Sequence, residues 1–395
     1  MSHPLINRDP RLLRLLNEGY ELEVRSTRLL VHSVPYVNSK RQVRTDGVLV
    51  MALAGESSTV PPDHTAYFIG EHPCTMDGAE LVQIKNQSGR QELSPDLVVD
   101  HYFSAKPRTP YANFYDKVTL YVEMISGPAR ALLPGVTACT FKPISASEEE
   151  SVFLYTDTAS TRAGIDVASR RFHGQRLAIV GLGGTGAYVL DQAAKAPVAE
   201  IHLFDGDTVY QHNAFRYPGA MSLEELKAAP KKVYYLHGVY SKMRRGVVPH
   251  AEMITAANVD ALKTFDHVFL CVDKGSVRRL IVDALRGTRT QTFDVGMGIH
   301  LNEETQEVFG ICRVSTINEK HHAHAERCIP MVDADEHGIY RNNVQIADLN
   351  ALNAALAVVR WKKACGFYAN FGGEHHMAYT IVTNVITGDE SGYED

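Results

Sequence analysis

The chain has 395 residues, of which 45% are hydrophobic and 22% charged, and its formal net charge is −6. This composition is that of an ordinary globular protein, and the acidic balance argues against a nucleic-acid-binding surface. The N-terminus lacks an apolar signal core, and no stretch approaches the roughly 20 apolar residues of a membrane span. We therefore expect a cytoplasmic protein of two domains, with neither a nucleic acid nor a membrane as partner.

Residues 1–148 are predicted to form a smaller α+β domain. Strand-like runs, such as 47–53 and 118–122, alternate with turns rich in Pro, Gly and Asp. A helical pattern is confined to 10–16 and to a segment near Phe114. A polar, acidic stretch at 143–150 predicts the boundary, so that residues 149–395 form the second domain. The first domain carries no chemical motif that predicts catalysis.

The second domain contains a glycine-rich turn between an apolar run at 177–180 and a helical pattern at 187–196. The glycines of this turn are Gly181, Gly183, Gly184 and Gly186. The first peptide N–H groups of a helix lack partners, and glycine lets a phosphate approach them closely. The order strand, turn, helix therefore predicts a nucleotide site. Gly181, Gly183 and Gly186 also satisfy the dinucleotide pattern of oxidoreductases.

Polar residues follow the next apolar run, where Asp205 and Asp207 are succeeded by Asn213 and Arg216. Asp205 has roughly the 20-residue offset of a ribose ligand, whereas Asp207 can simply stabilise the turn. An oxidoreductase has no use for the Asn and the Arg. A site that cleaves ATP between its α- and β-phosphates needs such donors for the departing pyrophosphate. The alternative is that both residues cap a helix that begins near Ser222.

Two further charged residues belong to this pattern. Lys232 lies in a Pro-Lys-Lys-Val stretch, where Lys231 competes for the same role and the adjoining valine favours Lys232. Asp273 ends the apolar run 268–272. Ligands bind at the carboxyl ends of strands in open α/β sheets, and a carboxylate there can hold the magnesium that offsets charge on the phosphates.

With these motifs the chain resembles the ThiF/MoeB superfamily, the adenylation fold shared by ubiquitin-activating enzymes and activators of sulfur-carrier proteins. The resemblance covers roughly residues 162–363. It depends on Gly-x-Gly-Gly-x-Gly, Asp-x-Asp-x-Val-x-x-x-Asn-x-x-Arg, Pro-Lys-Lys-Val and Cys-x-Asp, in this order. It implies an α/β fold, in which a Rossmann-like adenylation domain with a mostly parallel sheet follows the α+β domain. ATP and Mg²⁺ are the cofactors that it implies.

The resemblance also implies roles for the matching residues. Asp205 would hold the ribose of ATP. Asn213, Arg216 and Lys232 would contact its phosphates. Asp273 would hold the magnesium ion.

Members of the superfamily also use an arginine from a helix before the glycine turn, which often reaches the partner's site across a homodimer. Arg162 is the best match, although its spacing to the turn is shorter than in the sulfur-carrier activators. Arg170 and Arg171 remain alternatives. A homodimer is therefore an expectation from the resemblance.

A crossover loop is expected near 317–343, between a strand at 308–316 and a helix at 344–363. In the superfamily this loop runs over the adenylate and in many members carries a cysteine that takes the acyl group as a thioester. Cys328 is the only cysteine in it, and a neighbouring Arg and nearby histidines can favour the reactive thiolate. The alternatives are a buried, inert cysteine and direct transfer to a conjugating partner.

The implied reaction is adenylation of the C-terminal glycine of a ubiquitin-like protein, which is then transferred to a conjugating-enzyme-like partner.

Gly296 and Gly298 predict either a channel for the Gly-Gly tail or only a bulge. The chain has no Cys-x-x-Cys pair, the zinc ligands of many sulfur-carrier activators, and resembles the activating enzymes of bacterial ubiquitination-like operons. This resemblance implies that residues 1–148 recruit the ubiquitin-like protein or the conjugating enzyme. A sulfur-carrier-protein adenylyltransferase, an NAD-dependent oxidoreductase and a catalytically silent scaffold remain alternatives.

Overall fold

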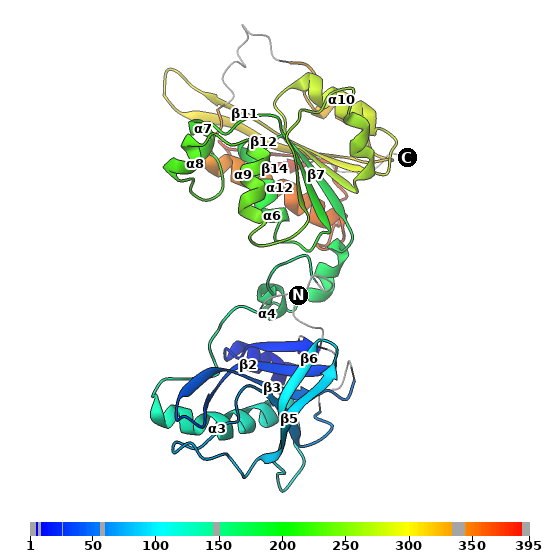
Figure 1. Ribbon diagram of the computed structural model, residues 1–395. Coiled ribbons are helices and arrows are strands. Elements are labelled where there is room, and N and C mark those ends of the chain that lie inside the picture. Colours follow the sequence, from blue (N-terminus) through cyan, green and yellow to red (C-terminus); the bar gives the residue numbers. More distant parts are fainter. Residues whose placement is uncertain are drawn as a thin grey trace. The chain divides into compact units, whose positions relative to one another are not determined.

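The structure is a computed structural model that describes residues 5–6, 9–25, 27–55, 60–144, 151–333 and 344–388. The chain divides into two compact units, both drawn in Figure 1. The first comprises Met1–Glu150 and Tyr155–Asp166, and the second comprises Ser151–Leu154 and Val167–Asp395. Among the described residues, no helix is both long and apolar enough to cross a membrane.

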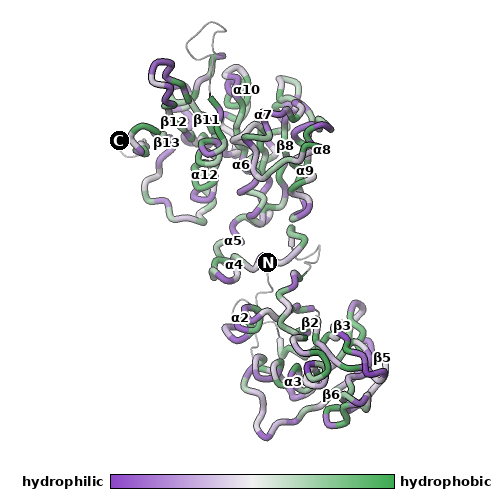
Figure 2. The backbone as a smooth tube through the Cα atoms, turned by 90° about the vertical axis from the view of Figure 1, so that its left-hand side faces the viewer, coloured by the Kyte–Doolittle hydropathy of each residue, from purple (hydrophilic) through white to green (hydrophobic). Residues whose placement is uncertain are grey.

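The first unit contains a six-stranded sheet in which every neighbouring pair is antiparallel. Its strands are β1 (Leu22–Arg25), β2 (Arg28–Val37), β3 (Val43–Ala52), β4 (Thr65–Ile69), β5 (Lys85–Ser94) and β6 (Leu97–Ser104), in the order β1-β2-β3-β4-β6-β5. The edge strand β5 is hydrophilic along most of its length (Figure 2). A polar edge of this kind discourages pairing with other chains.

Two helices, α2 (Pro10–Asn17) and α3 (Phe114–Leu132), pack against this sheet. The strand predicted at 118–122 is wrong, because these residues lie inside α3. Asn113 caps the helix by accepting a hydrogen bond from the backbone N–H of Asp116 at 2.9 Å, and Val118, Val122 and Ile125 are buried on one helical face. With helices and an antiparallel sheet, the unit has the predicted α+β class.

The second unit is built on an eight-stranded sheet. Its strands are β7 (Arg176–Val180), β8 (Glu200–Phe204), β9 (Val247–His250), β10 (His267–Leu270), β11 (Gln291–Leu301), β12 (Val308–Ile317), β13 (His376–Thr380) and β14 (Val385–Gly388). The order is β14-β13-β12-β11-β10-β7-β8-β9. Pairs from β9 to β11 are parallel, and those from β11 to β14 are antiparallel. The predicted Rossmann-like α/β class is confirmed.

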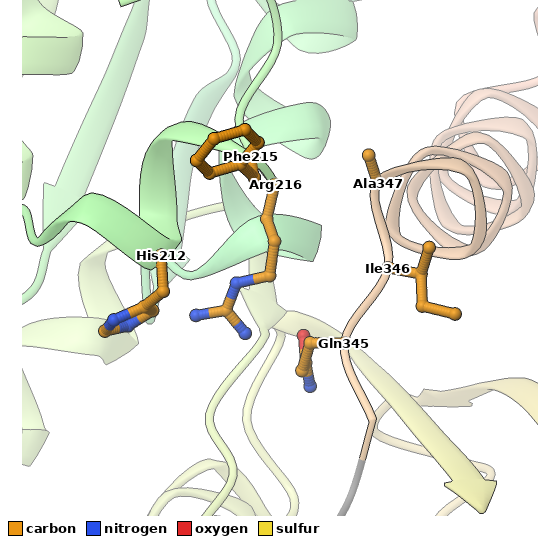
Figure 3. A pocket seen from close by; sticks show the side chains of 6 residues that line it. All are labelled: His212, Phe215, Arg216, Gln345, Ile346 and Ala347. Atoms are coloured by element: carbon orange, nitrogen blue, oxygen red, sulfur yellow. The ribbon is translucent and has the colours of Figure 1, made fainter. Parts of the chain in front are cut away.

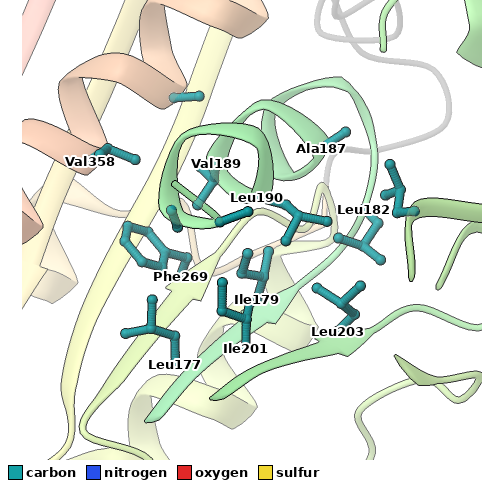
Figure 4. Close-up of a cluster of buried hydrophobic side chains, with 14 of the residues drawn as sticks. Leu177, Ile179, Leu182, Ala187, Val189, Leu190, Ile201, Leu203, Phe269 and Val358 are labelled. Carbon is teal, nitrogen blue, oxygen red and sulfur yellow. The ribbon is translucent and has the colours of Figure 1, made fainter. Parts of the chain in front are cut away.

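Helices cover both faces of the parallel part of this sheet. They are α6 (Gly184–Ala193), α7 (Gln211–Ala214), α8 (Leu223–Lys227), α9 (Lys232–Tyr240), α10 (Gly275–Leu285), α11 (Ala325–Cys328), α12 (Ala347–Ala364) and the 3-10 helix η2 (Val259–Thr264). Ile179 and Phe269 pack with α6, α9 and α12 on one face (Figure 4). Val180 and Leu270 pack with α10 and η2 on the other face. Burial on both faces explains the continuous apolar runs of these strands.

Three strand ends come together at one edge of this sheet. Val180 of β7 pairs with Phe204 of β8 and with Leu270 of β10, so the residues that follow these strands are neighbours. The crossover segment begins after β12 and includes α11, and residues 334–343 of the predicted loop lie outside the described residues. Residues 145–150 of the predicted boundary stretch also lie outside them.

Candidate functional site

Three glycines of the turn are required by the packing of the chain itself. Gly181 has φ of +87°, and a Cβ there would lie 2.7 Å from the carbonyl oxygen of Cys271. A Cβ on Gly186 would lie 1.9 Å from the carbonyl oxygen of Gly181, and one on Gly184 would lie 2.1 Å from Nδ2 of Asn350. These glycines therefore allow the turn to close against β10 and α12.

Gly183 differs from the other three. A Cβ at this position would meet no atom within 4 Å. Gly183 is the N-cap of α6 and, because it has no side chain, provides no side-chain cap for this helix. The space in front of the first turn of α6 is thus open, and the partial positive charge of a helix N-terminus suits an anion. Packing does not require this glycine, and its lack of a side chain leaves room for a phosphate.

Asp205 is nearly buried, with 5% of its surface exposed, and its carboxylate holds the glycine turn. Oδ2 accepts a hydrogen bond from the backbone N–H of Leu182 at 2.7 Å, and Oδ1 accepts one from the N–H of Asp207 at 2.8 Å. The residue predicted to hold a ribose therefore fastens β8 to the turn after β7. Oδ2 also accepts a hydrogen bond from Nζ of Lys232 at 3.4 Å, whereas Oδ1 keeps a second lone pair for a ligand.

Both lysines after β8 are engaged by the acidic turn. Nζ of Lys232 donates to Oδ2 of Asp207 at 2.7 Å and lies 3.4 Å from Oδ2 of Asp205. Nζ of Lys231 donates to the carbonyl oxygen of Gly206 at 2.6 Å. Lys232 is the buried one of the two, and Lys231 is exposed.

Asn213 and Arg216 do not cap the next helix. Ser222 and Glu225 cap α8 reciprocally, at 3.2 and 2.7 Å, so the capping alternative is wrong. Asn213 instead caps its own short helix α7, where Oδ1 accepts a hydrogen bond from the N–H of Tyr210 at 2.8 Å. Its amide Nδ2 donates no hydrogen bond within the described part of the chain.

A hollow of about 540 Å³ lies between α7 and the segment that enters α12. Figure 3 shows the guanidinium of Arg216 extending between His212 and Gln345. The lining residues are His212, Phe215, Arg216, Gln345, Ile346 and Ala347. Nε of Arg216 is buried without a hydrogen-bond partner. Its terminal nitrogens donate no hydrogen bond to the described residues, so the hollow presents a cation with available donors.

Burial and the positive charges near this hollow change the pKa of His212. Desolvation lowers the pKa of His212, and the charges of Arg216 and Lys232 lower it further. Desolvation also lowers the pKa of Arg216. The structure thus brings Arg216 and Lys232 within electrostatic reach of one imidazole, and an anion bound among them would relieve their mutual repulsion.

Asp273 is exposed just beyond β10, and its carboxylate accepts no hydrogen bond from the described residues. Because Leu270 pairs with Val180, Asp273 and Gly183 each lie three residues past paired strand ends. An exposed carboxylate that accepts no hydrogen bond from the described part of the chain fits Mg²⁺, which prefers oxygen ligands and keeps several waters. Asp273 is the residue that would hold the ion here.

The remaining predicted residues lie in other parts of the fold. Arg162 ends α4 (Thr158–Arg162) in the first unit, and its Nε donates to Oδ1 of Asn17 at 3.0 Å. The guanidinium of Arg171 donates to the carbonyl oxygen of Gly366. Cys328 ends α11 and is half-buried.

Sequence reasoning missed two residues that support the turn. The hydroxyl of Tyr217 donates to the carbonyl oxygen of Leu182 at 2.6 Å. Oδ1 of Asn350 on α12 accepts a hydrogen bond from Oγ1 of Thr185 at 2.9 Å. Asn350 is fully buried, and a polar residue on the apolar face of the predicted helix 344–363 was the available signal.

The predicted channel at Gly296 is occupied by the chain itself. A Cβ on Gly296 would lie 2.5 Å from Nη2 of Arg313, and the carbonyl oxygen of Gly296 accepts a hydrogen bond from Nδ2 of Asn353 at 2.9 Å. A Cβ on Gly298 would meet only His300, at 3.9 Å. Gly296 therefore makes room for a guanidinium in this structure.

Two family models match the chain. Residues 161–336 match the ThiF family, and residues 10–158 match a domain of unknown function, DUF6791. The second unit therefore carries a ThiF-family domain, and the predicted superfamily is confirmed for this part of the chain. No curated protein matches the sequence.

Solved structures of low sequence identity are similar to the chain. MccB of E. coli with MccA-N7isoASN aligns at 14% identity and a TM-score of 0.43, and MccB with ATP at 14% and 0.41. Each alignment covers 57% of this chain and 66%, just under two thirds, of MccB. PaaA aligns at 15% identity and a TM-score of 0.41, over 57% of this chain and 75% of PaaA.

Proposed function

We propose that the ThiF-family domain catalyses ATP- and Mg²⁺-dependent adenylation of the C-terminal glycine of a ubiquitin-like protein, for transfer to a conjugating-enzyme-like partner. The observation that carries this proposal is the open space at Gly183, in front of the first turn of α6. A nucleotide phosphate bound there would meet unpaired N–H groups and the positive end of the helix.

The phosphates beyond the first would meet the cationic side chains after β8. Among the described residues, neither the guanidinium of Arg216 nor the amide Nδ2 of Asn213 donates a hydrogen bond to the protein, so both have donors for a phosphate. Lys232 would exchange part of its ion pair with Asp207, whose side chain is 51% exposed, for a phosphate oxygen. Such donors stabilise the charge that develops on the departing pyrophosphate.

Asp273 would hold a magnesium ion, which would offset negative charge on the phosphates when bound. The residues of the chain bind and orient the nucleotide, and no side chain has to act as acid or base. The carboxylate of the substrate attacks the α-phosphorus, an oxygen–phosphorus bond forms, and pyrophosphate leaves as the α–β bond breaks. Positioning of the two reactants should therefore supply much of the rate.

The ubiquitin-like substrate is supported by the extra N-terminal unit and by the absence of Cys-x-x-Cys pairs from the sequence. The same geometry would serve a sulfur-carrier protein, which presents the same glycine carboxylate. An oxidoreductase is disfavoured, because it would leave Asn213, Arg216 and Asp273 without a role. The homodimer and the role of Arg162 across it belong to this proposal as well.

The deciding experiment is ATP–pyrophosphate exchange with the full chain, Mg²⁺ and a ubiquitin-like protein that ends in Gly-Gly. We expect exchange that requires this tail and that falls at least about a hundredfold in Asp273→Ala. Asp283→Ala, which removes an exposed carboxylate of α10 that pairs with Arg286, is the matched control. Absence of exchange with every such protein, together with tight NAD binding, would replace the proposal by the oxidoreductase.

A further inference from the structure

The segment that carries Asp273 joins the end of β10 to the start of α10, and side chains from outside the segment hold it at both ends. On one side is a buried group of charges formed by Arg278, Asp294 and Arg313. On the other side is Asp333, which belongs to the crossover segment, here residues 318–333. The group of charges contacts the crossover segment at Cys328, and Asp333 is itself part of that segment.

The buried charges act on the residue before Asp273. Nη2 of Arg278 donates to the carbonyl oxygen of Val272 at 2.6 Å, and Nε of Arg278 lies 3.2 Å from Oδ1 of Asp294. Asp294 is fully buried and is bound on its other oxygen by Nη1 of Arg313 at 2.5 Å. A buried carboxylate between two arginines fixes geometry more than it adds stability, because desolvation offsets the attraction.

Arg313 extends this network to the crossover segment. Its Nη1 also donates to the carbonyl oxygen of Cys328 at 3.3 Å. A chain of contacts therefore runs from Cys328 through Arg313, Asp294 and Arg278 to Val272. A shift of α11 would be transmitted to the residue next to Asp273.

The second contact acts on the start of α10. The N-cap residue of this helix, Lys274, makes no capping hydrogen bond with its side chain. Instead, Oδ1 of Asp333 accepts a hydrogen bond from the backbone N–H of Ser276 at 3.0 Å. Gly275 lies directly against the same segment, because a Cβ there would lie 2.3 Å from the carbonyl oxygen of Val332.

We propose that Arg278 and Asp333 are positioning residues for Asp273, and that through them the crossover segment sets the affinity of the site for magnesium-bound nucleotide. The inference rests on the proposed function, because it assigns a consequence to Asp273 as the magnesium ligand. Neither residue needs to touch the nucleotide. Each holds the backbone on one side of the carboxylate.

Asp333→Ala provides the main test, because Asp333 is exposed and its loss should leave the fold intact. Binding of a fluorescent ATP analogue to the full chain is measured against free Mg²⁺ concentration. We expect the concentration for half-maximal enhancement to rise about fivefold, the cost of losing a helix cap, while binding without Mg²⁺ stays unchanged. Glu326→Ala is the control, because Glu326 is an exposed carboxylate of the same segment that pairs with Arg279 and Arg286.

Arg278→Lys tests the other side, with Arg279→Lys as its neighbour on the same helix. Lysine keeps the charge but cannot bridge Val272 and Asp294 together, so the magnesium requirement should rise while the thermal unfolding temperature stays near that of the wild type. If Arg278→Lys does not fold, Asp333→Ala alone decides.

An unchanged magnesium requirement in Asp333→Ala, or an equal shift in Glu326→Ala, would overturn the positioning role. A wild-type chain that binds no nucleotide would instead overturn the proposed function, and this inference with it.

Discussion

The carboxylate of Asp205 accepts a hydrogen bond from the backbone N–H of Leu182 at 2.7 Å. A residue at the end of β8 thereby sets the shape of the glycine turn that follows β7. Asp205 consequently has a structural role in addition to the ribose contact that we propose. Substitutions at this position should affect stability and nucleotide binding together.

Asp205→Asn should lower the free energy of unfolding by about 1–3 kcal/mol, because one backbone N–H loses its acceptor in a buried setting. Nucleotide affinity should fall as well, since the turn is no longer held. Urea unfolding and nucleotide titration measure the two effects. Asp207→Asn is the control: its half-exposed ion pair with Lys232 should contribute less than about 1 kcal/mol. Equal losses of stability in the two variants would contradict this reading of Asp205.

Gly183→Ala and Gly186→Ala should separate nucleotide binding from folding. A Cβ on Gly183 enters open space, whereas a Cβ on Gly186 meets a backbone oxygen at 1.9 Å. We expect Gly186→Ala to lose about 2–3 kcal/mol of stability. Gly183→Ala should stay within about 1 kcal/mol of the wild type and yet bind nucleotide about tenfold more weakly. Undiminished affinity in Gly183→Ala would mean that the phosphate does not approach there.

Cys328→Ser should leave ATP–pyrophosphate exchange within about twofold of the wild type, because the thiol is not needed for adenylation. It should abolish any thioester with the ubiquitin-like protein. That step would form a sulfur–carbon bond at the acyl carbon and release AMP. Non-reducing gels with and without thiol measure it, and Cys365→Ser is the control at another half-buried cysteine. A thioester that survives in Cys328→Ser would exclude this residue as the acceptor.

Subunit mixing can test Arg162. If Arg162 acts across a homodimer, inactive Arg162→Ala and Asp273→Ala chains should complement each other when they exchange subunits. Only one of the two sites in each mixed dimer is complete, so exchange activity should recover to about a quarter of the wild-type value. Analytical ultracentrifugation establishes the dimer first. Mixed dimers without recovery would place the action of Arg162 within its own subunit or outside the reaction.

His267 should make stability depend on pH. Burial lowers the pKa of His267 to about 4, whereas an unfolded histidine titrates near pH 6.5. Between these values the unfolded state binds more protons, so the contribution is complete above pH 6.5 and declines as the pH falls toward 4. At pH 5 the loss should be about 2 kcal/mol.

Urea unfolding of the wild type and of His267→Gln at pH 7.5 and pH 5 measures this contribution. The pKa of His375 is also lowered to about 4, by burial and then by His321 and His324. His375 is unchanged in the variant, so the difference between the two proteins isolates His267. An equal decline in stability in both proteins would contradict the prediction.

The sequence by itself determined the features that depend on near neighbours in the chain. The apolar runs before Gly181, Asp205 and Asp273 predicted strands, and the motifs that follow these runs carried the resemblance that implied a mostly parallel sheet. The same local patterns failed at 118–122, where a run of apolar residues is compatible with a strand and with a buried helix. The cap at Asn113 and burial against the first sheet decided for the helix.

Only the tertiary structure decided which side chains meet. Asp205 reaches Leu182, Thr185 reaches Asn350 over 165 residues of sequence, and Arg313 occupies the space at Gly296. Such contacts depend on how strands and helices pack in three dimensions, and spacing along the chain does not encode them. The residue types of the site were therefore readable from the sequence, but their partners followed from the way that β7, β8, β10 and α12 come together.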